Sequence, residues 1–206
     1  MMYRVATKQA ANGRLRVGNR RPKQRRRLRK PYRQGDLDGL CGVYSAVNAV
    51  RFLCPEVDGT TASWLFEALM QALPKVEADP ATTVTSGVGR RQLAHLLKRA
   101  IGHVGDEMDI RLTATRLPDR LRQTRSLDEL WVWLGRRVSP KCVAVLGLGG
   151  RYSHWTVTVE VTPSQIRLFD SGTMGVLRRR SCTVGKAVKR TAISPVHVFL
   201  IARKEG

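Results

Sequence analysis

The chain has 206 residues and a mass of 23.1 kDa, which suits one domain with a short appendage. Hydrophobic residues make up 42%, enough for a sizeable core, so a wholly disordered protein is excluded. The 37 Lys and Arg residues outnumber 16 Asp and Glu, giving a formal net charge of +21. There is no run of about 18 apolar residues and no apolar signal core, so we expect a cytoplasmic protein without a membrane span.

Most of the excess charge lies at the N-terminus. Residues 1–33 hold thirteen basic residues and no acidic one, whereas the remaining 173 residues hold 24 basic and 16 acidic residues. Such a segment is too charged to bury a core of its own. The sequence therefore predicts a basic, flexible arm over residues 1–31 and one folded domain over residues 32–206. Residues 1–33 are candidates to bind nucleic acid through its phosphates or an acidic protein partner; a merely solvated tail is the third interpretation.

Helices are predicted first along the folded part. Apolar residues at helical spacing indicate four of them, at 41–53, 61–73, 90–101 and 126–138. Thr60 or Thr61 is the expected N-cap of the second helix, and Ser126 with Glu129 fits a capping box for the fourth. The intervening Pro-, Thr- and Gly-rich residues 74–89 are expected to form a loop.

Strands dominate the C-terminal part. They are expected at 142–148, 154–161, 165–170 and 196–202, with a turn at residues 162–164 joining the second and third. Helices followed by an antiparallel sheet predict an α+β fold. Matching the apolar faces of the hairpin pairs Val157 with Leu168, which places Trp155 opposite Asp170.

Cys41 is the best candidate for a reactive thiol. It starts the most apolar helix, where unpaired N–H groups and the helix dipole favour a thiolate. Gly39 and Gly42 leave the backbone beside it open to a substrate carbonyl. Cys54 instead follows a helix, where the dipole opposes a thiolate, while Cys142 opens an apolar strand and Cys182 lies in a basic segment.

A thiol nucleophile needs a base, and the base needs a group that orients it. His154 begins one strand of the predicted hairpin, and Asp170 ends the next strand 16 residues later. A bulge or twist must bring the two together, because the expected register sets Trp155 opposite Asp170. On the loop before Cys41, the Gln34 side-chain amide is placed to donate to an oxyanion beside the Cys41 N–H.

Three segments together resemble the papain-like cysteine peptidases, and most closely their C39-like subgroup. They are the run from Gln34 to Tyr44, Ser153-His154-Trp155-Thr156, and Leu168-Phe169-Asp170-Ser171-Gly172, and the resemblance covers roughly residues 32–175. It implies a papain-like fold, with a helical half that begins at the cysteine helix and packs on an antiparallel sheet. It also implies Cys41 as nucleophile, His154 as base, Asp170 as orienting residue and Gln34 as oxyanion residue.

The expected function is hydrolysis of a peptide or isopeptide bond in a protein or peptide substrate by this set of residues. No metal or organic cofactor is expected. Two alternatives stay open. The same triad serves transglutaminases and deamidases, which differ in the second nucleophile. The second alternative is a catalytically inactive peptidase-fold protein that binds nucleic acid through its basic arm.

Overall fold

The computed structural model describes residues 30–35, 38–73, 80–185 and 189–204. Almost all of the predicted arm at residues 1–31 lies outside these ranges, so its flexibility stays a prediction. The helices are α1 (Cys41–Leu53), α2 (Gly59–Ala72), α3 (Pro80–Ser86), α4 (Arg90–Met108), α5 (Asp119–Arg122) and α6 (Leu127–Arg137). The strands are β1 (Leu112–Arg116), β2 (Cys142–Gly150), β3 (His154–Val161), β4 (Gln165–Leu168), β5 (Val176–Arg178), β6 (Cys182–Val184) and β7 (Thr191–Arg203), and a short 3₁₀ turn, η2 (Arg179–Ser181), joins β5 to β6.

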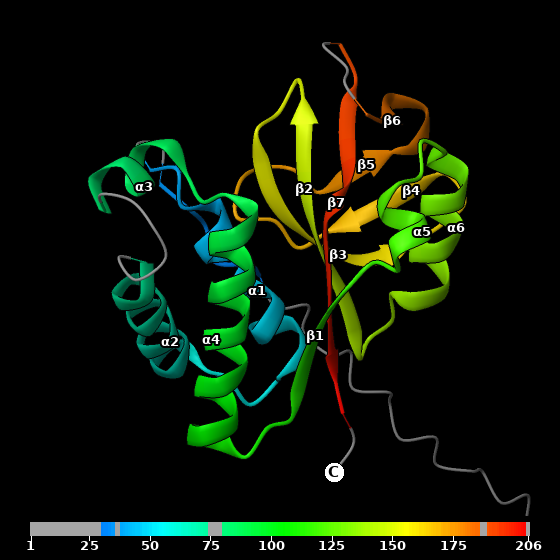
Figure 1. The fold of residues 1–206 in the computed structure, drawn as a ribbon. Helices are drawn as coiled ribbons and strands as arrows, with labels where there is room; N and C mark the ends of the chain where they lie inside the picture. The colour runs from blue at the N-terminus through cyan, green and yellow to red at the C-terminus, as the bar shows by residue number, and fades with distance from the viewer. Residues whose placement is uncertain (1–29, 36–37, 74–79, 186–188, 205–206) are drawn as a thin grey trace, which may run out of the picture.

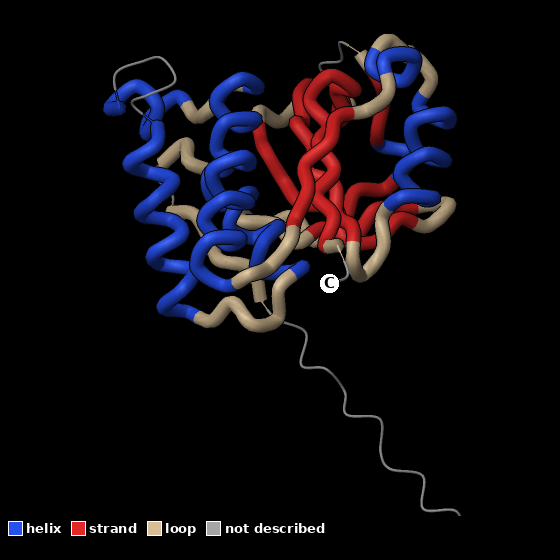
Figure 2. The backbone as a smooth tube through the Cα atoms, turned by 60° about the horizontal axis from the view of Figure 1, so that its bottom comes forward, coloured by secondary structure: helices blue, strands red, loops and turns tan. Residues whose placement is uncertain are grey.

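One sheet lies between two layers of helices (Figures 1 and 2). Helices α1, α2 and α4 pack on one face, and α5 and α6 pack on the other. The chain is therefore α+β, with its first helices packed on a mainly antiparallel sheet, as the sequence predicts. Within the described residues, no helix is both long and apolar enough to cross a membrane.

The strand order is β1-β7-β2-β3-β4-β5, with β6 added in parallel to the end of β7. Strand β2 is central and buried on both faces, which explains its unbroken apolar run. Val143 and Val145 join the core under α1, whereas Ala144 and Leu146 join the core under α6. This two-sided core supports the sheet where β2 ends and β3 begins, beside the start of α1.

The sequence-based boundaries hold for two helices and one strand. Helix α1 and strand β3 have the expected limits, and α6 begins after the Ser126 N-cap, whose hydroxyl accepts the Glu129 N–H at 3.2 Å. The predicted cap of α2 is wrong: the Asp58 carboxylate accepts the Thr61 N–H at 2.9 Å, so the helix begins two residues earlier. An ionised carboxylate at that position also favours the positive end of the helix dipole.

Further expectations need correction. The strand expected at residues 165–170 ends at Leu168, so Asp170 follows β4 rather than ending it. The predicted loop at 74–89 contains α3, and α4 continues seven residues beyond its expected end at Ile101. Strand β7 begins five residues earlier than expected, because it passes Pro195 through a shift in its register with β2. The sequence did not predict strand β1, strand β5, strand β6 or helix α5, since each is only three to five residues long and carries little periodicity.

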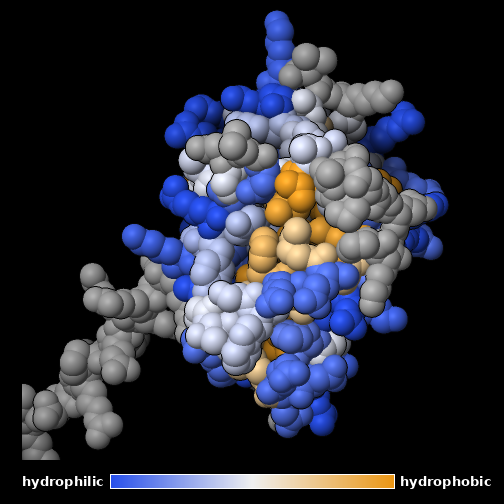
Figure 3. Space-filling view, turned by 90° about the vertical axis from the view of Figure 1, so that its left-hand side faces the viewer, coloured by the Kyte–Doolittle hydropathy of each residue, from blue (hydrophilic) through white to orange (hydrophobic). Residues whose placement is uncertain are grey.

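The outer face of the first helical layer is mixed. Figure 3 shows apolar side chains in a strip at its centre, with polar and charged side chains around them. The exposed Trp64 of α2 and the half-buried Tyr44 and Phe66, whose ring centroids are 5.1 Å apart, belong to this layer. The functional residues proposed from the sequence lie elsewhere, at the edge where α1 meets the sheet.

Candidate active site

Cys41 occupies the first position of α1, and its side chain is 7% exposed. The N-cap residue Leu40 provides no side-chain hydrogen bond, so the N–H groups of the first turn have no capping side chain. The Cys41 Sγ accepts the backbone N–H of Trp155 at 3.4 Å. The start of β3 thus directs an N–H group toward the sulfur at the first residue of α1.

Gly42 is required for this close approach. A Cβ atom at Gly42 would lie 2.0 Å from Cγ2 of Val88 and 3.3 Å from Cδ1 of Trp155. The Trp155 indole N–H is fixed in turn by the carbonyl of Val88 at 2.8 Å. The glycine therefore lets the segment before α4 and the start of β3 close around the helix start. Sequence reasoning attributed the glycine only to access for a substrate.

His154 and Asp170 are in direct contact. Nε2 of His154 lies 2.7 Å from Oδ1 of Asp170, and the second carboxylate oxygen accepts the N–H groups of Gly172 at 2.8 Å and Met174 at 3.3 Å. Asp170 is 3% exposed. Because the carboxylate is held by backbone donors on one side, it fixes the ring orientation of His154 on the other.

A bulge in β3 creates this contact. The expected pairing of Val157 with Leu168 is wrong: Leu168 pairs with Thr158, and the register shifts by one between Thr158 and Glu160. The Phe169 N–H donates to the Val157 carbonyl at 2.8 Å, so the shifted register continues past Leu168. If this register is continued to Asp170, the residue lies on the same face of the sheet as His154 and is its diagonal neighbour. The two side chains bridge the distance between diagonal neighbours. The sequence predicted the need for a bulge but not its position.

The environment of His154 keeps its ring protonated. Burial acts to lower the pKa, but hydrogen bonds to Asp170 and to the Cys41 side chain outweigh it, and together with the two negative charges they raise the pKa to about 9. Burial acts to raise the pKa of Asp170, yet the hydrogen bond with His154 leaves it below its usual value. At neutral pH the site therefore holds an imidazolium between the Asp170 carboxylate and the Cys41 sulfur.

Gln34 lies on the loop that enters α1 and lines the same cleft as Cys41 and His154. Its backbone N–H donates to the Ser171 carbonyl at 3.0 Å, and its side-chain Nε2 donates to the Asp38 carbonyl at 2.5 Å. Its Oε1 accepts the Ser171 hydroxyl at 3.4 Å. An amide nitrogen carries two N–H donors, so one remains for an oxyanion. The structure thus brings Gln34, Cys41, His154 and Asp170 to one place.

Asn48 holds this entering loop to α1. Its fully buried side chain accepts the Tyr32 N–H at 2.8 Å and donates to the Tyr32 carbonyl at 3.0 Å. The Arg51 guanidinium stacks 4.2 Å from the Tyr32 ring centroid. Sequence reasoning did not identify this clamp, since the partners are 16 residues apart and nothing in the helical spacing marks the pair.

A cleft of about 1080 Å³ opens over the sulfur and the imidazole. Its walls come from the entering loop, the segment 85–90, the ends of β2 and β3, and parts of β6 and β7. Arg90, Arg125 and His197 also line it, and sequence reasoning assigned none of them a functional role. Burial, followed by the charge of Arg90, lowers the pKa of His197, which favours the neutral ring. The positive charges that face the cleft from this side are therefore those of arginines.

The other cysteines lack such surroundings. Burial raises the pKa of Cys54 and of Cys182 to about 11, and it also raises the pKa of Cys142. All four cysteines are unpaired thiols. Across the described part of the chain, no three His, Cys, Asp or Glu side chains are grouped as they would be to hold a metal ion.

Comparison with known proteins adds no relative to this geometry. No protein-family model matches the chain, and no curated protein matches its sequence significantly.

Alkylation of the folded protein tests the state of Cys41. Because His154 stays protonated up to a pKa of about 9, we expect iodoacetamide at pH near 7 to modify Cys41 on the order of 10²-fold faster than Cys54 or Cys182. Replacing His154→Ala removes the cation, so the Cys41 rate should fall near pH 7 and recover above about pH 9, where thiols ionise unaided. Mass mapping of each cysteine measures the rates. Equal rates at Cys41 and Cys142 in the wild-type protein would contradict this description of the site.

Proposed function

We propose that this protein is a papain-like cysteine peptidase that hydrolyses a peptide or isopeptide bond. The observation that carries the proposal is the contact of His154 with the Asp170 carboxylate at 2.7 Å, next to a cysteine at a helix start. An imidazole held between a carboxylate and a thiol is the arrangement that a thiol nucleophile and its base require. The papain-like assignment of the fold rests on the same elements: the cysteine at the start of the first described helix, the histidine at the start of β3, and the aspartate two residues after the end of β4.

The first half of the reaction forms an acyl-enzyme. The Cys41 thiolate attacks the substrate carbonyl carbon, and the carbonyl electrons move to the oxygen. The Cys41 backbone N–H and the second N–H of Gln34 donate to this oxyanion. The His154 imidazolium then gives its proton to the leaving nitrogen, the C–N bond breaks, and a thioester remains on Cys41.

The second half releases the product. Neutral His154 takes a proton from water, the resulting hydroxide attacks the thioester carbonyl, and the C–S bond breaks to give a carboxylic acid and the Cys41 thiolate. Asp170 stabilises the imidazolium in both halves and holds its Nε2, which leaves Nδ1 to face the reacting groups. Acyl transfer to an amine uses the same steps with a different second nucleophile. We favour water as the second nucleophile, because the cleft is open to solvent and, within the described part of the chain, carries no acidic side chain free to attract an ammonium group. Among the described residues, Asp38 is the only acidic one that lines the cleft, and its oxygens accept the N–H groups of Gly35 and Leu40.

The alternative of a catalytically inactive protein that uses this fold to bind nucleic acid is less consistent with these contacts. A protein that uses this fold only for binding does not need a protonated imidazole beside a thiol, and burying the Asp170 carboxylate costs free energy that a neutral side chain would avoid. The partner proposed for residues 1–33, a nucleic acid or an acidic protein, stays a prediction, because residues 1–29 lie outside the described ranges.

Hydrolysis of a casein or peptide-library substrate tests the proposal. Cys41→Ala should remove all turnover while the protein stays folded, because alanine suits the first position of α1 and the hydrogen bonds lost are those of the sulfur with the Trp155 N–H and with His154. Gln34→Ala should lower kcat by about 10²-fold, the usual effect of losing one oxyanion donor. Cys142→Ala is the matched control and should retain full activity. Full turnover by Cys41→Ala would end the peptidase proposal. Product formation that requires an added amine, with no acid released in water alone, would favour acyl transfer.

Charge in the cleft indicates the class of substrate. Arg90 and Arg125 line it without an ion pair to any described carboxylate, so substrates with acidic side chains should be preferred over basic ones. We expect Arg125→Glu to raise KM for acidic peptides by about tenfold and to lower it for basic ones, with kcat little changed. Arg120→Glu, on the same side of the sheet but outside the cleft lining, is the control. Identical KM values for acidic and basic peptides in the wild-type enzyme would exclude this preference.

A further inference from the structure

A second charged hollow borders the first residue of β6, whereas the last residue of β6 borders the catalytic cleft. The hollow has a volume of about 740 Å³ and is bordered by β5, η2, the start of α6 and the residue before β7. Val184 and Gly185 border the catalytic cleft, whereas Cys182 borders this hollow. We call it the arginine groove; four arginines line it, Arg178, Arg179, Arg180 and Arg190.

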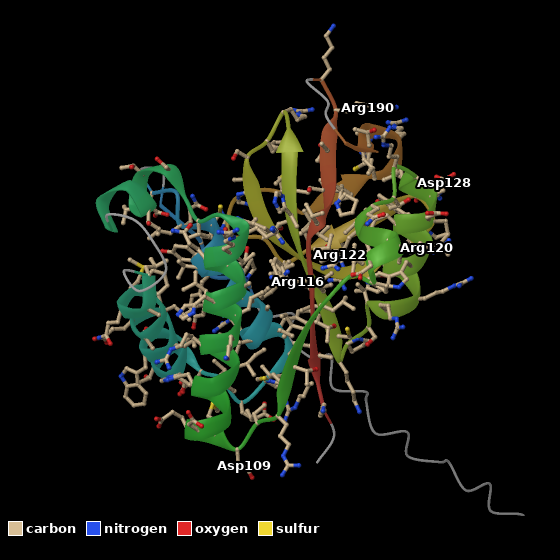
Figure 4. The ribbon with its side chains drawn as sticks, viewed as in Figure 1. Asp109, Arg116, Arg120, Arg122, Asp128 and Arg190 are labelled. Atoms are coloured by element: carbon tan, nitrogen blue, oxygen red, sulfur yellow. The ribbon has the colours of Figure 1, made fainter. Side chains whose placement is uncertain are left out.

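The groove is almost free of negative charge. Among the described residues Asp128 is the only acidic one that lines it, and its Oδ1 is already paired with the Arg179 guanidinium at 2.6 Å. Figure 4 shows Arg190 and Asp128 at this end of the molecule. The surrounding sequence has the same character, since residues 171–204 contain eight Lys and Arg and no Asp or Glu. Arg178, Arg180 and Arg190 form no ion pair with any acidic residue in the described ranges.

Two of the arginines also contact neutral groups. Arg179 donates to the Pro163 carbonyl at 3.2 Å and lies 5.7 Å from the Trp131 ring centroid, and Arg190 donates to the Arg180 carbonyl at 3.0 Å. These contacts orient both guanidinium groups, of which that of Arg179 is also paired with Asp128. Like charges gathered at one site repel each other, and a bound anion relieves that repulsion. The site is therefore partly organised for an anion before one arrives.

We propose that the arginine groove binds the phosphate backbone of a nucleic acid, independently of the catalytic cleft. Guanidinium groups match phosphate oxygens with paired N–H donors, and Ser164 and Gln165 add polar groups at the rim. No Phe, Tyr or Trp lines the groove, so it offers no platform for base stacking and binding should not depend on sequence.

A long polyanion fits this surface better than an acidic peptide. The described residues carry 24 Lys and Arg against 12 Asp and Glu, so the positive field extends well beyond the groove. A nucleic acid follows such a field over many phosphates, whereas a short peptide is held by the groove alone. The groove also has few apolar side chains to receive those of a peptide; Leu127, Pro163 and Cys182 are the ones that line it.

Salt-dependent binding of the full-length chain tests the proposal. The probe is a fluorescein-labelled DNA duplex of mixed sequence, followed by anisotropy over a range of KCl concentrations. The groove variant is Arg178→Gln, Arg180→Gln, Arg190→Gln. The control is Arg91→Gln, Arg99→Gln, Arg111→Gln, which removes the same charge from exposed positions in and just after α4. Both variants keep the arm, so its contribution is the same in each.

The slope of log K against log salt is negative, and each lost phosphate contact reduces its magnitude by about 0.9. The groove variant should therefore lose about 2 to 3 from the slope and bind about tenfold or more weakly, while the control keeps the wild-type slope. Equal slopes for the two variants would overturn the proposal, and so would competition by poly-glutamate as effective as that by unlabelled DNA, which would indicate an acidic protein instead. Because alkylation of Cys41 should be the same in all three proteins, failure here is separate from failure of the peptidase proposal.

Discussion

The contact between His154 and Asp170 depends on one extra residue in β3, and the rest of the site depends on that contact. Without the shift between Thr158 and Glu160, Asp170 would lie on the opposite face of the sheet from His154. With it, the carboxylate holds one imidazole nitrogen at 2.7 Å and leaves the other directed to the sulfur. A one-residue irregularity, stabilised by the core on both faces of the sheet, thus decides whether the imidazole has an orienting partner.

The other components converge on the same point from separate parts of the chain. The start of α1 provides the sulfur, and Gly42 lets Val88 and Trp155 close around it. Asn48 fixes the entering loop through both backbone groups of Tyr32, and Ser171, next to Asp170, receives the backbone N–H of Gln34. The oxyanion donor and the orienting carboxylate are therefore tied to one another through adjacent residues. Arginines line the walls of the cleft, and four other arginines line the nearby groove. The domain is therefore positively charged even apart from residues 1–29.

Much of this arrangement was predictable from local patterns, and the part that was not is tertiary. The apolar spacing in 41–53 marks α1, and the alternation in 154–161 marks β3, so the elements that carry Cys41 and His154 follow from the sequence. The register between β3 and β4 does not, because pairing by apolar faces favours Val157 opposite Leu168 and hides the bulge. Likewise the Asn48 clamp and the arginines of the cleft join residues far apart in the chain, and no short-range spacing encodes such contacts. The chemistry of Cys41 and His154 is a prediction that the contacts support and that experiment must test.

We expect His154 to be a cation held by Asp170 and Cys41 at neutral pH, and titration of its ring by NMR measures that charge state. With ¹⁵N-labelled histidine, the His154 ring nitrogens should stay protonated through about pH 8 and titrate with a pKa of about 9. In Cys41→Ala the pKa should fall, because the thiol contribution is lost, but it should remain above the usual value near 6.5 because Asp170 still holds the ring. A wild-type His154 that titrates at or below about 6.5, with no change in Cys41→Ala, would contradict the account.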